Sequence, residues 1–389
     1  MSQLLESRWS ETKEALLEGL QGHKRTVMAT TLENTRKYLA ESATAGATSA
    51  GNVATLNRVI LPVIRRVMPT VIANELVGVQ PMTGPVGQIH TLRVRYADSF
   101  NSTNGTDVTA GDEALSPFKI AEGYSGAATD KAAATAALEG VAGNRLSIQI
   151  LKQTVEAKTR KLSARWTFEA AQDAQAQQGI DIEAEIMAAL AQEITAEIDQ
   201  EVIGSLNSLA GTVLTYDQNT VSGTATFVGD EHAALAVQIN RASNLIAQRT
   251  RRGAGNYAVV SPTTLTLLQS ATTSAFARTT EGTFEAPTNT KFVGTLNGAM
   301  RVFVNSYATS DDVLIGYKGA SESDAPAFYC PYIPLMSSGV VLDPSTFEPV
   351  VSFMTRYGYV ELTNTASSLG NAADYLAKVA VTSANLKFA

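Results

Sequence analysis

DIEAEIMAALAQEITAEIDQEVIGSL, Asp181 to Leu206, is the stretch that decides the fold of this chain. Its apolar residues recur every four positions, at Ile182, Ile186, Leu190, Ile194, Ile198, Val202 and Leu206. This spacing predicts a helix, and Asp181 with the acids that follow it suits the helix N-terminus. A helix of about 26 residues is roughly 39 Å long, and a step of four residues advances about 400°, so the apolar stripe winds around it. We therefore expect a spine helix that touches several layers of the fold.

Two blocks of opposite charge precede and include this helix. From Arg145 to Arg165, basic residues stand against a single acid, Glu156, whereas from Trp166 to Asn240 acids recur without any Lys or Arg. The blocks can be two solvated faces, or they can meet within one subunit or between subunits. Charge complementarity between subunits determines which surfaces pair, and in which register, more than it increases the affinity between them. The candidates for such contacts are Lys158, Arg160, Lys161, Arg165, Glu193, Glu197 and Glu201.

Composition excludes several classes of protein. The chain has 389 residues, of which 44% are hydrophobic, and a net charge of −7, which argues against nucleic acid as the main partner. Apolar runs such as Val71 to Val79 fall short of the ~20 residues that span a bilayer, so we expect no membrane partner. The single cysteine, Cys330, lies in an apolar, proline-flanked strand and is predicted to be a buried, inert thiol. With three scattered histidines, we expect no metal site, no cofactor and no catalytic residues.

The rest of the chain reads as an α+β protein with extensions. Residues 1–42 have helical periodicity and a small-residue linker follows them, which predicts an N-terminal arm rather than part of a core. Strand patterns enter and leave a loop over residues 97–144 that is rich in Gly, Ala, Ser, Thr and Asp, which indicates a long two-stranded projection. The second strand pattern returns through Leu162, Ala164, Trp166 and Phe168. After Gly211, short helices and strands alternate as in a compact domain.

The segment RRGAGNYAVVSP, Arg251 to Pro262, carries glycines at the spacing of a dinucleotide-binding turn. Such a turn requires a strand before the glycines and a helix after them. Here the helical pattern precedes Gly253 and Gly255, and the strand pattern follows them. We therefore interpret these glycines as the exit from a helix, with Arg249, Arg251 and Arg252 near its negative end, and not as a phosphate site.

Several blocks resemble the major capsid proteins of T4-like tailed bacteriophages. They are RVILPVIRRVMPTVIANELVGVQPMTGP (58–85), VEAKTRKLSARWTFEAAQDAQAQQGIDIEAEI (155–186), RRGAGNYAVVSP (251–262), VLIGYKG (313–319), APAFYCPYIPL (325–335) and FEPVVSFMTRYGYVEL (347–362). The tail after Leu362 is not matched. The resemblance implies an HK97-like capsid fold. Its parts would be an N-terminal arm (1–56), a peripheral domain (57–96 and 145–211, with spine helix 181–206), an extended loop (97–144), an axial domain (212–340), and a return to the peripheral domain with a C-terminal tail (341–389).

The resemblance also implies a function without enzymatic activity. The chain would self-assemble through hexameric and pentameric capsomers into the icosahedral head shell that encloses double-stranded DNA, without sequence-specific binding. It would assemble in the bacterial cytoplasm and reside in the virion, with scaffold, portal and decoration proteins as further partners. The candidate contacts then include Arg249, Arg251 and Arg252, where axial domains would converge. The alternatives are a pentameric vertex paralogue and an encapsulin-like compartment shell; a nucleotide-binding α/β enzyme has little support.

Overall fold

The structure is a computed structural model that combines helices and sheets in the α+β organisation expected from the sequence. It divides into two compact units: unit 1 comprises Met1–Gly87, Val155–Ile203 and Phe328–Val360, and unit 2 comprises Gln88–Thr154, Gly204–Ala327 and Glu361–Ala389. Each unit is described by itself. The residues that the structure describes are 9, 13–14, 16–17, 22–44, 72–99, 108–112, 114, 135–139, 143–178, 181–221, 228–250, 252–271, 276–278, 291–321, 324–362 and 372–386.

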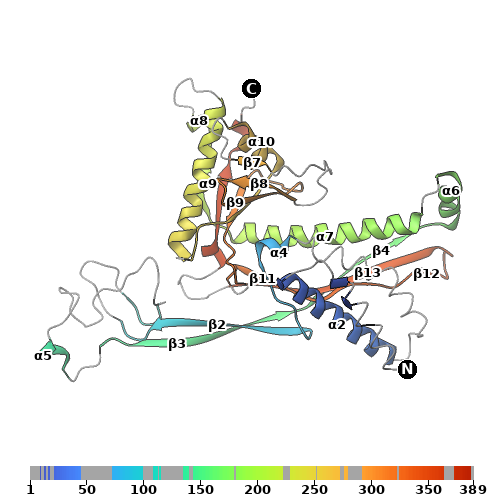
Figure 1. Cartoon of the computed structure of the whole chain (residues 1–389), viewed down its shortest axis with the longest axis horizontal. Helices are drawn as coiled ribbons and strands as arrows, with labels where there is room; N and C mark the ends of the chain where they lie inside the picture. Colours follow the sequence, from blue (N-terminus) through green and yellow to red (C-terminus); the bar gives the residue numbers. More distant parts are fainter. Residues whose placement is uncertain are drawn as a thin grey trace. The chain divides into compact units, whose positions relative to one another are not determined.

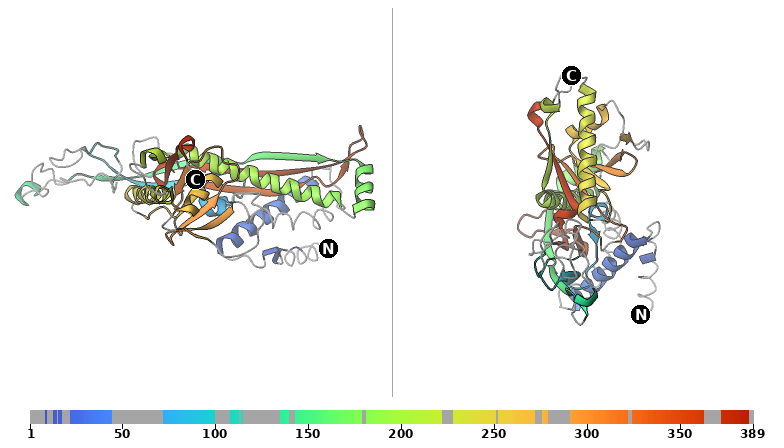
Figure 2. Two further views of the ribbon diagram at one scale, coloured as in Figure 1. Left: turned by 90° about the horizontal axis from the view of Figure 1, so that it is seen from above. Right: turned by 90° about the vertical axis from the view of Figure 1, so that its left-hand side faces the viewer.

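Unit 1 is built on a five-stranded sheet. Its strand order is β1 (Gly78–Val79), β11 (Ala327–Ser337), β13 (Pro349–Glu361) and β12 (Val341–Leu342), and β4 (Lys158–Arg165) pairs antiparallel with β13. Helix α7 (Ile182–Leu209) lies along β4 and β13 (Figures 1 and 2). The described part of the unit also contains helices α2 (Gly22–Thr44), α4 (Ala73–Leu76) and α6 (Phe168–Gln178).

Helix α7 confirms the predicted spine helix. The side chain of Asp181 accepts a hydrogen bond from the Glu183 amide at 3.1 Å, as a capping residue does. Along the winding apolar stripe, Ile182 and Ile186 are half-buried, and every member from Leu190 onward is buried. The first turns of the helix therefore keep an apolar surface partly open.

Strand β4 ends earlier than its alternating pattern predicts. The pattern continued through Trp166 and Phe168, but β4 ends at Arg165 and Phe168 begins helix α6. The Thr167 hydroxyl oxygen accepts a hydrogen bond from the Ala170 amide at 3.3 Å, which caps the new helix. The helix cap at Thr167 thus outweighs the alternating, strand-like pattern of the sequence.

Helix α2 contributes to the core of unit 1, in contrast to the expected free arm. Val27, Met28 and Leu32 are buried. The buried Asn34 amide donates hydrogen bonds to the carbonyl oxygens of Met82, at 2.6 Å, and Tyr332, at 3.1 Å. These contacts tie α2 to segments far away in the sequence. The expected linker continues beyond α2 into residues 45–52, which lie outside the described part of the chain.

Unit 2 contains a seven-stranded sheet. The order is β5 (Thr212–Tyr216), β14 (Leu376–Val381), β10 (Val313–Gly316), β6 (Tyr257–Val260), β9 (Met300–Val304), β8 (Lys291–Leu296) and β7 (Phe276–Arg278). Helices α9 (Val228–Thr250) and α10 (Pro262–Ser270) pack their buried faces into its core. Shorter elements are α8 (Gln218–Val221), η1 (Ala372–Tyr375) and η2 (Ser383–Asn385).

Two strands fall in a different sheet from the one that the sequence analysis implied. Residues 341–389 were expected to return to the peripheral domain and end in a tail, but β14 pairs parallel with β5 and antiparallel with β10 inside the unit 2 sheet. Conversely, β11 was assigned with the axial segment 212–340 and instead pairs with β1 in unit 1. Local alternation predicts a strand but carries no information about its partner.

The predicted projection is present as a two-stranded sheet, β2 (Val86–Tyr96) with β3 (Leu146–Glu156). The two strands run side by side in both views (Figures 1 and 2). Between them the structure describes the short helix α5 (Thr135–Leu138) and a small cluster of Tyr96, Val108 and Ala114. Most of the predicted loop 97–144 lies outside the described residues. Within the described part of the chain, no helix is long and apolar enough to cross a membrane.

Candidate functional site

The first candidate site is an ion-pair cluster centred on Arg160 of β4. Alternation along β4 leaves Arg160 half-buried on the covered face, while Lys161 and Arg165 are exposed on the other. The Arg160 guanidinium forms ion pairs with Glu197 and Glu201, which lie one turn apart on α7. The distance from Nη2 of Arg160 to Oε2 of Glu201 is 2.6 Å. The cluster joins the basic block and the acidic block within one subunit.

Two tyrosines complete the Arg160 cluster. The guanidinium carbon lies 5.5 Å from the centre of the Tyr357 ring, and the Tyr357 hydroxyl donates a hydrogen bond to Glu201. The rings of Tyr357 and the buried Tyr329 are tilted against each other with centroids 5.2 Å apart. Sequence reasoning missed both tyrosines, because they lie on β13 and β11, far from β4 and α7 in the chain.

The environment keeps these groups in one protonation state. Burial alone would lower the pKa of the Arg160 guanidinium, but Tyr357, Glu201 and Glu197 outweigh it and raise the pKa. Burial, and then the hydrogen bond to Glu201, raise the pKa of Tyr357 far above that of a free tyrosine. Arg160 therefore stays charged and Tyr357 stays a donor across the physiological range.

The remaining candidates of the two charge blocks are exposed. Lys158 and Lys161 are exposed on β4, and Glu193 is exposed on α7. Arg165 is also exposed, and its Nε lies 3.8 Å from a carboxylate oxygen of Glu348, a long and weak pairing. The structure brings Arg160, Glu197 and Glu201 together and leaves these four on the surface.

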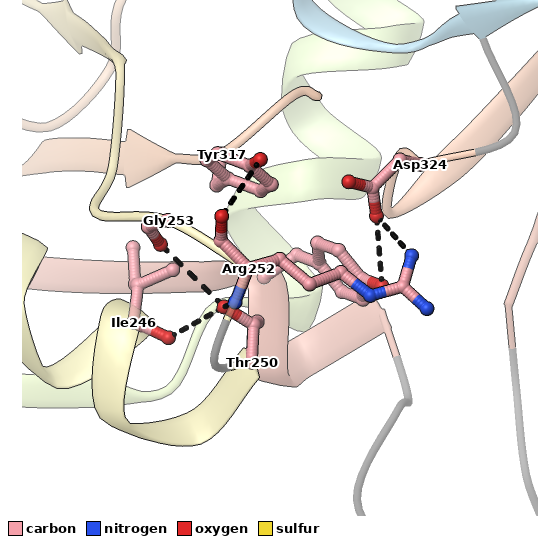
Figure 3. A network of polar contacts seen from close by, with 7 residues as sticks. Ile246, Thr250, Arg252, Gly253, Tyr317 and Asp324 are labelled. Carbon is pink, nitrogen blue, oxygen red and sulfur yellow. Dashed lines mark hydrogen bonds and ion pairs between the residues drawn. The ribbon is translucent and has the colours of Figure 1, made fainter. Parts of the chain in front are cut away.

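The second candidate site surrounds Arg252, directly after helix α9 (Figure 3). Nη1 of Arg252 lies 2.5 Å from Oδ1 of Asp324, and the Tyr375 hydroxyl donates to the same oxygen at 3.3 Å. The Tyr317 hydroxyl donates to the Arg252 carbonyl oxygen at 3.3 Å. The Tyr317 and Tyr375 rings stack with centroids 6.3 Å apart. Arg252 thus has a carboxylate partner in its own chain.

Arg249 is half-buried at the end of α9, and Arg251 lies outside the described residues.

The glycines of RRGAGNYAVVSP form the predicted exit from helix α9 into strand β6. A Cβ at Gly253 would lie 2.6 Å from the Tyr317 ring, and a Cβ at Gly255 would lie 2.8 Å from a methyl carbon of Ile315. The Thr250 hydroxyl donates to the carbonyl oxygens of Ile246, at 2.9 Å, and Gly253, at 3.5 Å, which completes the end of the helix (Figure 3). Close packing explains these glycines, which follow the C-terminal end of α9 and precede a strand.

Groups with catalytic chemistry are placed as ordinary core or surface residues. Cys330 is buried as predicted, and burial raises the pKa of its thiol to about 12. His232 is buried with Nδ1 2.6 Å from the Ser270 hydroxyl oxygen, and His90 is exposed. Within the ranges described above, no cluster of His, Cys, Asp and Glu could hold a metal ion.

Both candidate sites are networks of ion pairs, hydrogen bonds and ring contacts that join the chain's own helices and strands. The chain belongs to the family of the major capsid protein Gp23, whose family model matches residues 53–381. The match includes β14 and thereby corrects the expectation that the chain after Leu362 falls outside the family. Membership favours a major capsid protein over the vertex paralogue and the compartment shell.

Relatives at the sequence level are themselves capsid proteins. The chain is 30% identical to the major capsid protein of Vibrio phage KVP40, over 85% of this chain and 82% of the relative. It is also 30% identical to the major capsid protein of Enterobacteria phage T4, over 82% of this chain and 78% of the relative. Among solved structures, the capsid of Myoviridae phage XM1 is similar at 10% identity, with a TM-score of 0.44, over 79% of this chain and 91% of that chain. This structural likeness is weak, and the family assignment comes from the sequence matches.

Proposed function

We propose that this chain builds the hexameric and pentameric capsomers of an icosahedral head shell that encloses the double-stranded DNA of a tailed bacteriophage. Its family is that of a major capsid protein, a structural component of the virion that self-associates. The proposed role is purely structural and involves no enzymatic step. Assembly would take place in the bacterial cytoplasm, with scaffold, portal and decoration proteins as further partners.

The observation that carries the proposal is an exposed apolar stripe on β3. Leu146, Ile148 and Ile150 point to one face of this strand and are 58%, 69% and 68% exposed. Among the described residues β3 pairs only with β2, and an isolated two-stranded sheet is marginally stable in water. Fully burying one such aliphatic side chain contributes about 1.5–3 kcal/mol. A second copy of the chain that covers the stripe would supply this burial at every subunit contact.

Charge supports the same proposal in two ways. Lys158, Lys161, Arg165 and Glu193 are exposed, so we propose them as the contacts with neighbouring subunits. Arg160, Glu197, Glu201 and Arg252 have partners within the chain, so an additional role between subunits would have to share those partners. A net charge of −7 also suits a shell whose lumen must not hold DNA by attraction.

The test is a charge placed on the β3 stripe of the full-length chain. Ile148→Lys should reduce the yield of capsomers and shells about tenfold or more, as measured by light scattering and electron microscopy. The free energy of unfolding of the unassembled chain should stay unchanged, because Ile148 is exposed. Gln149→Lys is the matched control: it adds the same charge on the opposite, exposed face of the same strand.

Two outcomes would contradict the proposal at different levels. Normal assembly of Ile148→Lys, or an equal defect in Gln149→Lys, would show that the stripe is not the contact. A wild-type chain that forms neither capsomers nor shells at high concentration and moderate salt would overturn the shell function itself. Images that show pentamers without hexamers would favour the vertex alternative.

A further inference from the structure

Helix α7 carries a carboxylate that is not part of the Arg160 cluster. Asp199 is 1% exposed. Its Oδ1 accepts a hydrogen bond from the Ile72 amide at 2.8 Å, and its Oδ2 is buried without a hydrogen-bond partner within the described part of the chain. Burying an ionised carboxylate is costly unless several donors compensate the charge. A single backbone N–H is poor compensation.

Asp199 holds the segment of unit 1 that contains its first described strand. We call residues 72–79 the entry segment; it contains α4 and β1. Ala73, Leu76 and Val77 are fully buried, and β1 pairs parallel with β11. On its outer side, Glu75 forms an ion pair with Lys24 of α2 at 3.0 Å. The hydrogen bond from Ile72 to Asp199 therefore attaches the first residue of this segment to the spine helix.

Among the residues that the structure describes, few titratable groups lie around Asp199. On β11, burial is the main cause that raises the pKa of Tyr329, and the nearby carboxylates of Asp199 and Glu201 raise it further. Burial also raises the pKa of Cys330 to about 12. Both groups stay neutral at physiological pH. Glu201 is paired with Arg160 of β4 and receives the Tyr357 hydroxyl of β13, and Glu75 of α4 is paired with Lys24. Asp199 differs from both, since among the described residues it forms no ion pair and its one hydrogen-bond partner is the Ile72 amide.

We propose that Asp199 is a protonation-dependent latch that holds the entry segment tightly against α7 when neutral and loosely when ionised. Opening of the segment admits water to the carboxylate and relieves the cost of its buried charge. A neutral carboxyl bears much less of this cost, so protonation favours the closed state. The inference concerns unit 1 alone and does not depend on the shell function.

The direction of the pH effect follows from linkage. Burial raises the pKa of Asp199 from its ordinary 3.8 to about 7, and only the Ile72 amide opposes this. The open state, with the carboxylate in water, loses its proton near the ordinary pKa. Between about pH 4 and about pH 7 the closed state therefore binds more protons, and the opening constant rises up to roughly tenfold per pH unit. Above about pH 7 both states are ionised and the opening constant levels off.

Hydrogen exchange of the full-length chain, followed by mass spectrometry from pH 5 to pH 8, tests the latch. The quantity compared is the protection factor, from which the intrinsic pH dependence of exchange is removed. Protection of the amides of residues 72–77 should fall about tenfold or more between pH 5 and pH 7.5. Protection of the Trp166 amide, which donates to Pro349 elsewhere in unit 1, should not fall with it.

Two variants distinguish the effect of Asp199 ionisation from the effects of other titratable groups. Asp199→Asn keeps the shape and the acceptor oxygen but cannot ionise, so the protection of residues 72–77 should lose its pH dependence. Glu185→Gln, at an exposed position of the same helix, should keep the wild-type profile. A flat wild-type profile, or an unchanged slope in Asp199→Asn, would overturn the proposal. If Asp199→Asn fails to fold, the pH profile of the wild-type chain tests the proposal. Only a loss of protection that is confined to residues 72–77 supports the latch.

Discussion

Arg160 on β4 and Glu201 on α7 form an ion pair in which Nη2 and Oε2 are 2.6 Å apart, and Tyr357 binds the same carboxylate. The pair joins the basic block of the chain to the acidic block within one subunit. Its neighbour on the strand, Lys161, points to the opposite, exposed face. Adjacent residues of one basic run thus have different roles, and substitutions can separate them.

Removal of the Arg160 guanidinium should destabilise the subunit. In Arg160→Met, the carboxylates of Glu197 and Glu201 and the Tyr357 ring lose their cation, so the free energy of unfolding should fall by about 1–2 kcal/mol. Urea denaturation of the unassembled chain measures this. Lys161→Met, on the exposed face, should change it by no more than about 0.5 kcal/mol. An equal loss in both variants would contradict the assignment of Arg160 to an internal role.

Reversal of the charge at Lys161 should impair assembly and leave folding intact. Lys161→Glu presents an acid where a neighbouring subunit is proposed to meet a cation, so light scattering should show slower or less complete assembly. The defect should be largest at low salt, because the screening length shrinks from about 10 Å at 0.1 M to about 3 Å at 1 M. Lys161→Arg keeps the charge and should assemble normally. A defect that does not depend on salt would argue against an electrostatic contact.

Close packing at Gly255 should make an added methyl group costly. Its Cβ would lie 2.8 Å from Ile315 and 3.3 Å from the Gly316 carbonyl oxygen, so Gly255→Ala should lower the free energy of unfolding by about 1–3 kcal/mol. Gly204 lies inside α7 with nothing within 4 Å of an added Cβ. Gly204→Ala should therefore stabilise the helix by about 0.5–1 kcal/mol. Thermal or urea unfolding of the two variants gives the contrast, and the same sign in both would refute it.

Unit 2 should lose stability at alkaline pH through Tyr375. Burial, as the main cause, raises the pKa of Tyr375 from 10.0 to about 12. Between these values the unfolded chain releases a proton that the folded chain keeps, so the free energy of unfolding falls as pH rises from about 10 to about 12. Tyr375→Phe should make this fall shallower in urea titrations across the same range. Tyr307→Phe, at an exposed position, should retain the wild-type slope.

Local patterns predicted the individual elements well. The period of four predicted α7, and the alternation of short helices and strands expected after Gly211 is found in unit 2. The small residues at Gly253 and Gly255 marked the passage from α9 to β6. These features arise within one or two turns of chain, where backbone geometry and the side-chain period act directly. Thr167 shows the limit, because its cap begins α6 inside an alternating pattern.

The candidate site was predictable only in part. The charge blocks pointed to Arg160, Glu197 and Glu201 but left open whether they meet within a subunit. Tyr357, Asp324 and Tyr375 carried no local signal, since each acquires its role from a partner distant in the sequence. The roles proposed for Lys158, Lys161 and Arg165 between subunits stay predictions until the assembly experiments are done.

By itself, the sequence determined the periods, the caps, the close-packed glycines and the family, because these depend on residues near one another or on order along the chain. Only the tertiary structure decided that β14 joins the unit 2 sheet, that α2 enters the core of unit 1, and that Arg160 meets Glu201. Strand pairing and ion pairing depend on which surfaces remain to be covered once distant segments pack. The partner of each strand and of each charged side chain is therefore decided by the packing of the whole unit, and no short stretch of sequence predicts it.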